Sequence, residues 1–179
     1  ARNAGAKVAI GEWLLFMDDD CLPSAEWLLQ INHACQLSSA DFLIGAVEYD
    51  EIIGHYPERI VQNPNAYWPM AANMIFRKTS FEKLGGFSST FDSYHNEDSE
   101  LAIRALSQGM RYERVVKAKV VHRASYFDGM SIIRSAKHAG VWPILKKKYP
   151  AHYLHFSISQ LGGLVFFPME YLYTILYPI

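Results

Sequence analysis

Residues 13–20 have the sequence WLLFMDDD, an apolar run that ends in three consecutive aspartates. The run Trp13–Met17 is short and continuously apolar, which predicts a buried strand rather than an amphipathic helix. Carboxylates beside a buried strand are costly unless a cation or solvent stabilises their charge. Hard oxygen ligands suit Mg²⁺ or Mn²⁺, which keep coordination positions open for substrate phosphates. The stretch therefore predicts an α/β sheet with a divalent cation at the carboxyl end of one strand.

The directions of the three acids follow from the strand that precedes them. Where strand geometry continues, Asp18 and Asp20 point the same way and can share one ligand, whereas Asp19 turns aside. The alternative is a solvated acidic turn before the next helix. An Asp-x-Asp pattern alone leaves both interpretations open.

A second acidic cluster and a histidine follow at the ends of other predicted elements. Glu97 and Asp98 begin a predicted helix over residues 97–108, and His122 ends a predicted strand over residues 112–122. The helix dipole keeps first-turn acids ionised, and a positioned carboxylate can act as general base for a hydroxyl. Ordinary helix capping and a structural histidine are the alternatives. Side chains at element ends are how an open α/β sheet presents a metal and a base to a ligand.

Length and composition indicate one globular domain. The chain has 179 residues, of which 50% are hydrophobic and 14% aromatic, so it can bury a core. Its formal charge of −1 argues against a nucleic-acid-binding protein. The two cysteines, Cys21 and Cys35, have neither the spacing of a metal motif nor that of a disulfide framework, which indicates a reducing compartment.

Hydrophobic periodicity and turn residues predict the remaining elements. The predicted helices are one over residues 1–10 that Gly11 closes, one from Pro23 to about Leu37, a brief one capped by Thr79 that ends at Gly85 and Gly86, and one that Asp128 caps. The other predicted strands span residues 41–49 and 73–77.

Several stretches, in the same order, resemble the family 2 glycosyltransferases of the GT-A fold. The sequences ARNAG (1–5) and GEWLLFMDDD (11–20) are similar to the family's segment that ends in the Asp-x-Asp motif. The sequences NMIFR (73–77), LGGF (84–87) and NEDSELAIR (96–104) resemble the family's acceptor-side signature. The sequence VVH (120–122) resembles the family's strand that ends in a late histidine. The resemblance implies a GT-A α/β fold with a mixed sheet flanked by helices.

The resemblance also implies an activity and its site residues. Members of the family transfer a sugar, with inversion, from a nucleotide-diphosphate donor (UDP, GDP or dTDP type) to an acceptor hydroxyl, using Mn²⁺ or Mg²⁺. Carried over to this sequence, the metal ligands are Asp20, Asp18 and His122. The donor-binding residues are Arg2, Asp18, Asp19, Asn73 and Gly86. The catalytic base is Asp98, and Glu97 is its neighbour.

The resemblance further predicts the domain organisation and the cellular setting. Family members begin with a nucleotide-binding βαβ unit ahead of the first residue here, so residues 1–150 are expected to be the C-terminal two-thirds of a GT-A catalytic domain. Activity of this chain alone is left open. Residues 151–179 form an apolar segment that either associates with a membrane or packs against a protein partner. We expect a cytoplasmic enzyme at the membrane face, with a sugar or lipid-linked acceptor in cell-surface polysaccharide or glycolipid synthesis.

Two other functions remain compatible with the sequence. A metal-dependent nucleotidyltransferase also uses acid pairs on an α/β sheet, but it leaves the acidic helix start at residues 96–98 unexplained. A non-catalytic sugar- or partner-binding module would keep its activity after loss of Asp98. Function depends on the site and not on the fold class.

Overall fold

The computed structural model describes residues 1–50, 58–59, 62–94, 96–123, 125–126, 141–153, 155–156, 159–161 and 164–166. Five strands form one sheet in the order β1-β5-β3-β6-β2. Their bounds are β1 (Trp13–Phe16), β2 (Cys21–Pro23), β3 (Phe42–Tyr49), β5 (Met74–Arg77) and β6 (Tyr112–His122). The β3–β6 pair is parallel and the other three pairs are antiparallel. The predicted mixed sheet of an α/β fold is confirmed.

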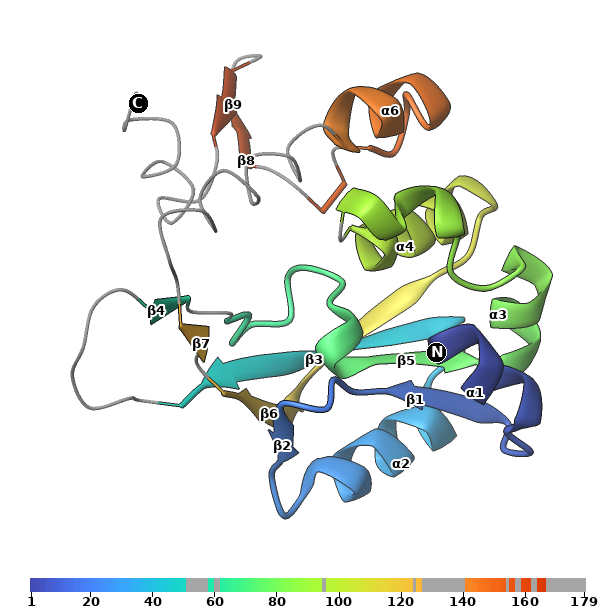
Figure 1. Cartoon of the computed structure of the whole chain (residues 1–179). Coiled ribbons are helices and arrows are strands. Elements are labelled where there is room, and N and C mark those ends of the chain that lie inside the picture. The colour runs from blue at the N-terminus through green and yellow to red at the C-terminus, as the bar shows by residue number, and fades with distance from the viewer. Residues whose placement is uncertain are drawn as a thin grey trace.

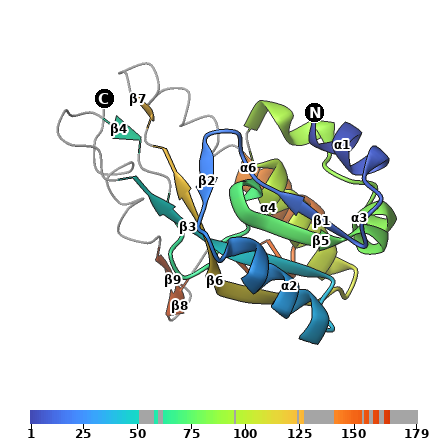
Figure 2. The same cartoon turned by 90° about the horizontal axis from the view of Figure 1, so that it is seen from below.

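Helices cover both faces of this sheet (Figure 1). Helix α2 (Trp27–Leu37) lies on one face, and α4 (Glu97–Ser107) lies on the other, with α6 (Val141–Lys148) beyond it. The view from below shows α2 against the strands (Figure 2). The remaining elements are α1 (Arg2–Val8), α3 (Lys78–Leu84), the 3₁₀ helices η1 (Ala71–Asn73) and η2 (Ser89–Tyr94), and two strand pairs, β4 (Glu58–Arg59) with β7 (Ser125–Tyr126) and β8 (Ser159–Leu161) with β9 (Leu164–Phe166).

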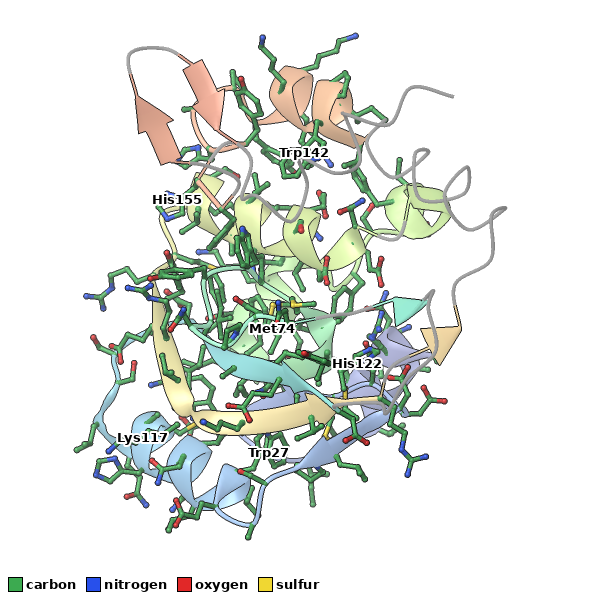
Figure 3. The ribbon with its side chains drawn as sticks, turned by 90° about the vertical axis from the view of Figure 1, so that its left-hand side faces the viewer. Trp27, Met74, Lys117, His122, Trp142 and His155 are labelled. Carbon is green, nitrogen blue, oxygen red and sulfur yellow. The ribbon has the colours of Figure 1, made fainter. Side chains whose placement is uncertain are left out.

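Alternation along the strands divides the core between the two faces. Phe42 and Ile44 of β3 pack with the larger cluster, which includes side chains of α3, α4 and α6. Leu43, between them, packs with Ile31 of α2 instead. Met74 of β5 and Trp27 of α2 likewise lie on opposite sides of the sheet (Figure 3). The period of two is that of a strand buried on both faces.

A buried asparagine fills an interruption between β3 and β6. The register of this parallel pair shifts between Gly45, opposite Val115, and Ala46, opposite Lys119. The Asn73 side chain, which is 0% exposed, occupies the shift. Its Nδ2 donates to the carbonyl oxygens of Ala46 and Ala118, both at 2.8 Å. Its Oδ1 accepts the indole N–H of Trp27 at 3.0 Å. One amide therefore satisfies two backbone carbonyls that the ladder leaves unpaired.

Several predictions of local structure are wrong at the ends of elements. Helix α2 begins at Trp27 and not near Pro23, because residues 21–23 pair with β6 as β2. Its buried side has Ile31 with Trp27, Ala34 and Cys35 packed around it, whereas Leu28 is 62% exposed. Such ends depend on tertiary pairing, which local propensity does not report.

The third helix also begins differently from its prediction. Helix α3 starts at Lys78 without a side-chain cap, so the helix cap predicted at Thr79 does not form. It does end as predicted, at Gly85, which is left-handed with φ +79°. Residues 89–94 form the 3₁₀ helix η2.

The end of the chain lies mostly outside the described residues, as does the helix predicted after Asp128. Within the described part, no helix is both long and apolar enough to cross a bilayer.

We predict that Gly45→Ala destabilises the fold. A Cβ at residue 45 would lie 2.2 Å from Nδ2 of the Asn73 amide, and the backbone of two strands surrounds that amide. The expected loss in free energy of unfolding is about 2 kcal/mol or more, as for overpacked cores, measured by urea denaturation. Gly5→Ala is the control, because a Cβ there meets nothing within 4 Å and alanine favours the helix by about 0.5–1 kcal/mol. Equal stability of the two variants would contradict the role given to Asn73.

Candidate active site

The topology brings the predicted site residues to one edge of the sheet. Strands β1, β3 and β6 run in the same direction, since β1 and β3 are both antiparallel to β5. Beyond Phe16 the chain leaves one edge strand, and at Cys21 it pairs with β6 as the other edge strand. The acids at residues 18–20 therefore lie where the chain passes over the carboxyl ends of the parallel strands, which is the ligand-binding edge of an open α/β sheet.

Arg2 joins two of the acidic motifs. Its Nη2 donates to Oδ1 of Asp18 at 2.6 Å, and its Nη1 donates to Oε1 of Glu97 at 2.5 Å. The three side chains are partly buried, with 34%, 28% and 17% of their areas exposed. The guanidinium carbon also lies 5.6 Å from the ring centre of Phe87. A planar fork with two charge-assisted hydrogen bonds fixes the start of α4 beside the aspartate segment.

The surroundings of Asp98 change the pKa of its carboxyl group. Its Oδ2 accepts the backbone N–H of Ala71 at 3.1 Å, and its Oδ1 accepts that of Ser99 at 2.6 Å. Burial raises the pKa of Asp98 to about 6, and the charge of Glu97 adds to the increase. The two backbone hydrogen bonds and Arg2 act in the opposite direction. The carboxylate is held in place and is more basic than one in solution.

Asp20 and His122, both predicted as metal ligands, are brought together with a residue that the sequence did not predict. One ligand atom from each of Asp20, Cys21 and His122 lies within 4.8 Å of the others. Nε2 of His122 is 3.5 Å from Oδ1 of Asp20. Nδ1 lies 2.8 Å from the carbonyl oxygen of Arg123, which only accepts, so Nδ1 carries the hydrogen there. Figure 3 shows His122 on this part of β6.

The three side chains fit a divalent cation. With Nδ1 protonated, Nε2 offers a lone pair toward the Asp20 carboxylate, so either a second proton or a metal ion belongs between the two acceptors. The backbone supports this arrangement, because the N–H of Arg123 donates to the carbonyl oxygen of Asp20 at 3.0 Å. Burial and the neighbouring acids raise the pKa of Cys21 to about 11, so without a cation its thiol is protonated.

The other two aspartates of the triple acid are placed differently. The strand ends at Phe16, and residues 18–21 form a turn in which the N–H of Cys21 donates to the carbonyl oxygen of Asp18. The strand geometry that would point Asp18 and Asp20 toward one ligand therefore does not continue, and Asp18 as a metal ligand stays a prediction. Asp18 is paired with Arg2 and is not part of the three-residue group. Asp19 is exposed in the turn, and its contact with a donor stays a prediction.

Two residues predicted to bind the donor have structural contacts, and a contact of either with a donor stays a prediction. The Asn73 amide is used within the sheet, so its side chain supports the site from below and does not offer hydrogen bonds to a ligand. Gly86 is buried with φ +76°, and a Cβ there would lie 2.6 Å from Oδ1 of Asn3. That same oxygen accepts the N–H of Phe87. Gly86 thus lets α1, which carries Arg2, approach the turn after α3.

A groove runs from Arg2 along the edge strand. Its volume is about 360 Å³, and its lining comes from α1 and from residues 13–17 in and after β1. The lining includes Arg2, which is paired with Asp18 and Glu97, and the other lining residues are largely apolar.

The chain is similar to known proteins whose names refer to sugar transfer or O-antigen biosynthesis. A family model described as the N-terminal domain of galactosyltransferase matches residues 62–127. The pre-mycofactocin glycosyltransferase of Mycobacterium tuberculosis is 25% identical over 169 residues, covering 84% of this chain and 35% of that protein. The O-antigen biosynthesis protein RfbC of Myxococcus xanthus is 26% identical over 151 residues, covering 69% of this chain and 12% of that protein. The chain thus spans about a third or less of these relatives.

Two solved structures share the fold. S. aureus TarS 1-349, in complex with UDP-GlcNAc, superposes with a TM-score of 0.54 at 16% identity, covering 87% of this chain and 52% of that one. The mannosyltransferase PcManGT of Pyrobaculum calidifontis, with GDP-Man and Mn²⁺, gives 0.53 at 22% identity, covering 87% and 48%. The GT-A fold predicted from the sequence is confirmed. The shared fold, the family model and the named relatives together support a family 2-like glycosyltransferase.

Proposed function

We propose that the protein is an inverting, metal-dependent hexosyltransferase that uses a nucleotide-diphosphate sugar. The observation that carries the proposal is the Arg2 fork, which holds the helix start with Asp98 beside the acids that follow β1. A base and a cation-binding group are thereby gathered at one edge of the sheet. The donor class is supported by the UDP-GlcNAc and GDP-Man complexes of the two structural neighbours.

Asp20 and His122 would hold the cation, and a bound divalent cation offsets the negative charge that the departing diphosphate gains. Arg2 reduces the negative charge of Asp18 and Glu97 on the same side. The acceptor oxygen attacks the anomeric carbon from the face opposite the diphosphate, and the bond between that carbon and the diphosphate oxygen breaks. The electron pair leaves with the diphosphate, so the configuration of the transferred sugar inverts.

Asp98 takes the proton of the acceptor hydroxyl in this reaction. Its two hydrogen bonds from the backbone fix the direction of the carboxylate without protonating it. A pKa of about 6 leaves it mostly ionised at pH 7, yet more basic than an ordinary aspartate. Glu97 is paired with Arg2, which leaves Asp98 the better base of the two.

The proposal extends to the acceptor and the location. We infer a sugar or lipid-linked acceptor in cell-surface polysaccharide or glycolipid synthesis, at the cytoplasmic face of a membrane. The similarity to an O-antigen biosynthesis protein supports the acceptor class. The run Lys146–Lys148 at the end of α6, followed by the apolar sequence 161–179, supports proximity to a membrane surface.

We predict that the chain binds UDP or GDP only with Mn²⁺ and Asp20. Calorimetric titration of each nucleotide, with and without Mn²⁺, measures this. Asp20→Asn should weaken binding at least about tenfold, because even partners of metal ligands contribute that much. The control is Glu82→Gln, a carboxylate that is 59% exposed on α3 and pairs with Lys78 in the preceding turn. Metal-independent binding, or equal affinity of both variants, would contradict the assignment of the metal to Asp20.

We predict that Asp98 makes the stability of the fold depend on pH. The folded pKa of about 6 lies above the ordinary value of 3.8, so the contribution of this group to stability is present at acid pH and is lost as pH rises through 6. Relative to the wild type, Asp98→Asn should therefore gain about 1 kcal/mol in free energy of unfolding between pH 5 and pH 7.5. Denaturant titrations at the two pH values measure the difference.

The matched control for this pH effect is Asp19→Asn. Asp19 is exposed, so its replacement removes no buried charge and should leave the difference from the wild type flat across the two pH values. A flat difference for Asp98→Asn as well would show that burial does not raise the pKa of this carboxyl, and the base would need another explanation.

A further inference from the structure

Cys21 lies inside the cation-binding group although the nucleotide-sugar reaction assigns it no role. In the antiparallel β2–β6 pair, Cys21 is directly opposite His122, so the two side chains leave the sheet on the same face. Only 6% of Cys21 and 8% of His122 is exposed. The Sγ, an imidazole nitrogen and an Asp20 oxygen lie within 4.8 Å of one another. Among the described residues, these three side chains have ligand atoms close enough together to hold one metal ion.

We propose that Cys21 is a third protein ligand, through its thiolate, and that this site selects a borderline cation such as Zn²⁺ or Co²⁺ over Mg²⁺. The inference rests on the proposed function only in placing the cation between Asp20 and His122. The three aspartates by themselves suggest oxygen ligands. The proposal adds a sulfur ligand to that site.

The ligand types determine the preference. Mg²⁺ is bound by oxygen, whereas a set of one carboxylate, one imidazole and one thiolate suits Zn²⁺ and its neighbours in the first transition series. Three protein ligands with one open position are also the usual arrangement of a reactive zinc site. The open side here is that of Asp20, whose side chain is 48% exposed. A phosphate oxygen can therefore reach the fourth position from solvent.

The geometry requires a small contraction on binding. Ligand distances of about 2.0–2.3 Å hold the donor atoms of a tetrahedral ion closer together than 4.8 Å. His122 is already oriented through its hydrogen bond to the Arg123 carbonyl, so Asp20 and Cys21 have to move toward it. Asp20 is in a turn and is exposed, which makes that movement easy.

The second cysteine gives a matched control. Cys35 is the only other cysteine of the chain, and it lies half-buried on α2, packed near Ile31 and outside the three-residue group. Burial raises the pKa of both thiols to about 11. The two thiols therefore have similar pKa values and differ in the residues that surround them. In Cys35→Ser, any thiolate bound to a metal has to be that of Cys21.

The test is a titration of the metal-free chain with Co²⁺ under reducing conditions, followed by absorption. A thiolate bound to Co²⁺ gives a charge-transfer band in the near ultraviolet, which oxygen and nitrogen ligands do not. We expect this band in the wild type and in Cys35→Ser, saturating at one Co²⁺ per chain, and no band in Cys21→Ser. Zn²⁺ should abolish the band by displacement, and excess Mg²⁺ should not.

Affinities provide a second readout. Cys21→Ser should weaken Zn²⁺ binding at least about tenfold, while Mg²⁺ affinity should change less than about twofold. Circular dichroism reports whether Cys21→Ser folds. If it does not fold, the wild type and Cys35→Ser still decide the question, because a band in both identifies Cys21.

Three outcomes overturn the proposal. Co²⁺ that binds the wild type without the charge-transfer band excludes a thiolate ligand, while the metal site of the proposed function survives. A band that is lost in Cys35→Ser assigns the thiolate to Cys35. Failure of Co²⁺ to bind at all removes Cys21 as a ligand, and the independent Mn²⁺-dependent nucleotide titration then decides whether the donor site fails with it.

Discussion

The buried amide of Asn73 is the interaction on which the arrangement of the sheet depends. It bonds to carbonyls of β3 and β6 where their register shifts, and it receives the indole of α2. The register shift determines which residues lie opposite each other at the carboxyl ends of both strands. Asn73 ends the same 3₁₀ turn whose first N–H, that of Ala71, donates to Asp98. A buried amide thus connects the sheet to the segment that binds the Asp98 carboxylate.

Electrostatics then determines how so many acids can share one edge. Arg2 neutralises part of the charge of Asp18 and Glu97, which is possible because Gly86 lets α1 approach the turn after α3. Burial raises the pKa of Asp98, and this effect exceeds the opposite effect of Arg2. Asp20 lies beside the His122 imidazole, with its Oδ1 3.5 Å from Nε2. Position alone therefore gives the carboxylates of this edge different environments: Asp18 and Glu97 are ion-paired, Asp98 is buried, and Asp20 lies near an imidazole.

Part of this arrangement could be predicted from the sequence, because it depends on short-range pattern. The apolar run before the three aspartates predicted strand β1, although β1 lies at the edge of the sheet with Leu15 exposed, and the helix start at Glu97 followed from its acids and the periodicity behind them. Pro23 was misassigned because a proline at a helix start and one on an edge strand have the same local signature. The condition for Asp18 and Asp20 to point the same way is not met for a related reason, since the strand ends before the acids begin.

The sequence by itself determined which chemical groups are present and which element ends they occupy: three aspartates after a strand, two acids at a helix start and a histidine at a strand end. Only the tertiary structure decided their partners. Arg2 meets Glu97 across 95 residues, and Cys21 faces His122 at a similar separation. Such contacts depend on strand register and on helix docking, which are set by the packing of the whole core. Local sequence patterns report the backbone only over a few residues, and so they could not show that Cys21 lies beside Asp20 and His122 or that the Asn73 amide is used within the sheet.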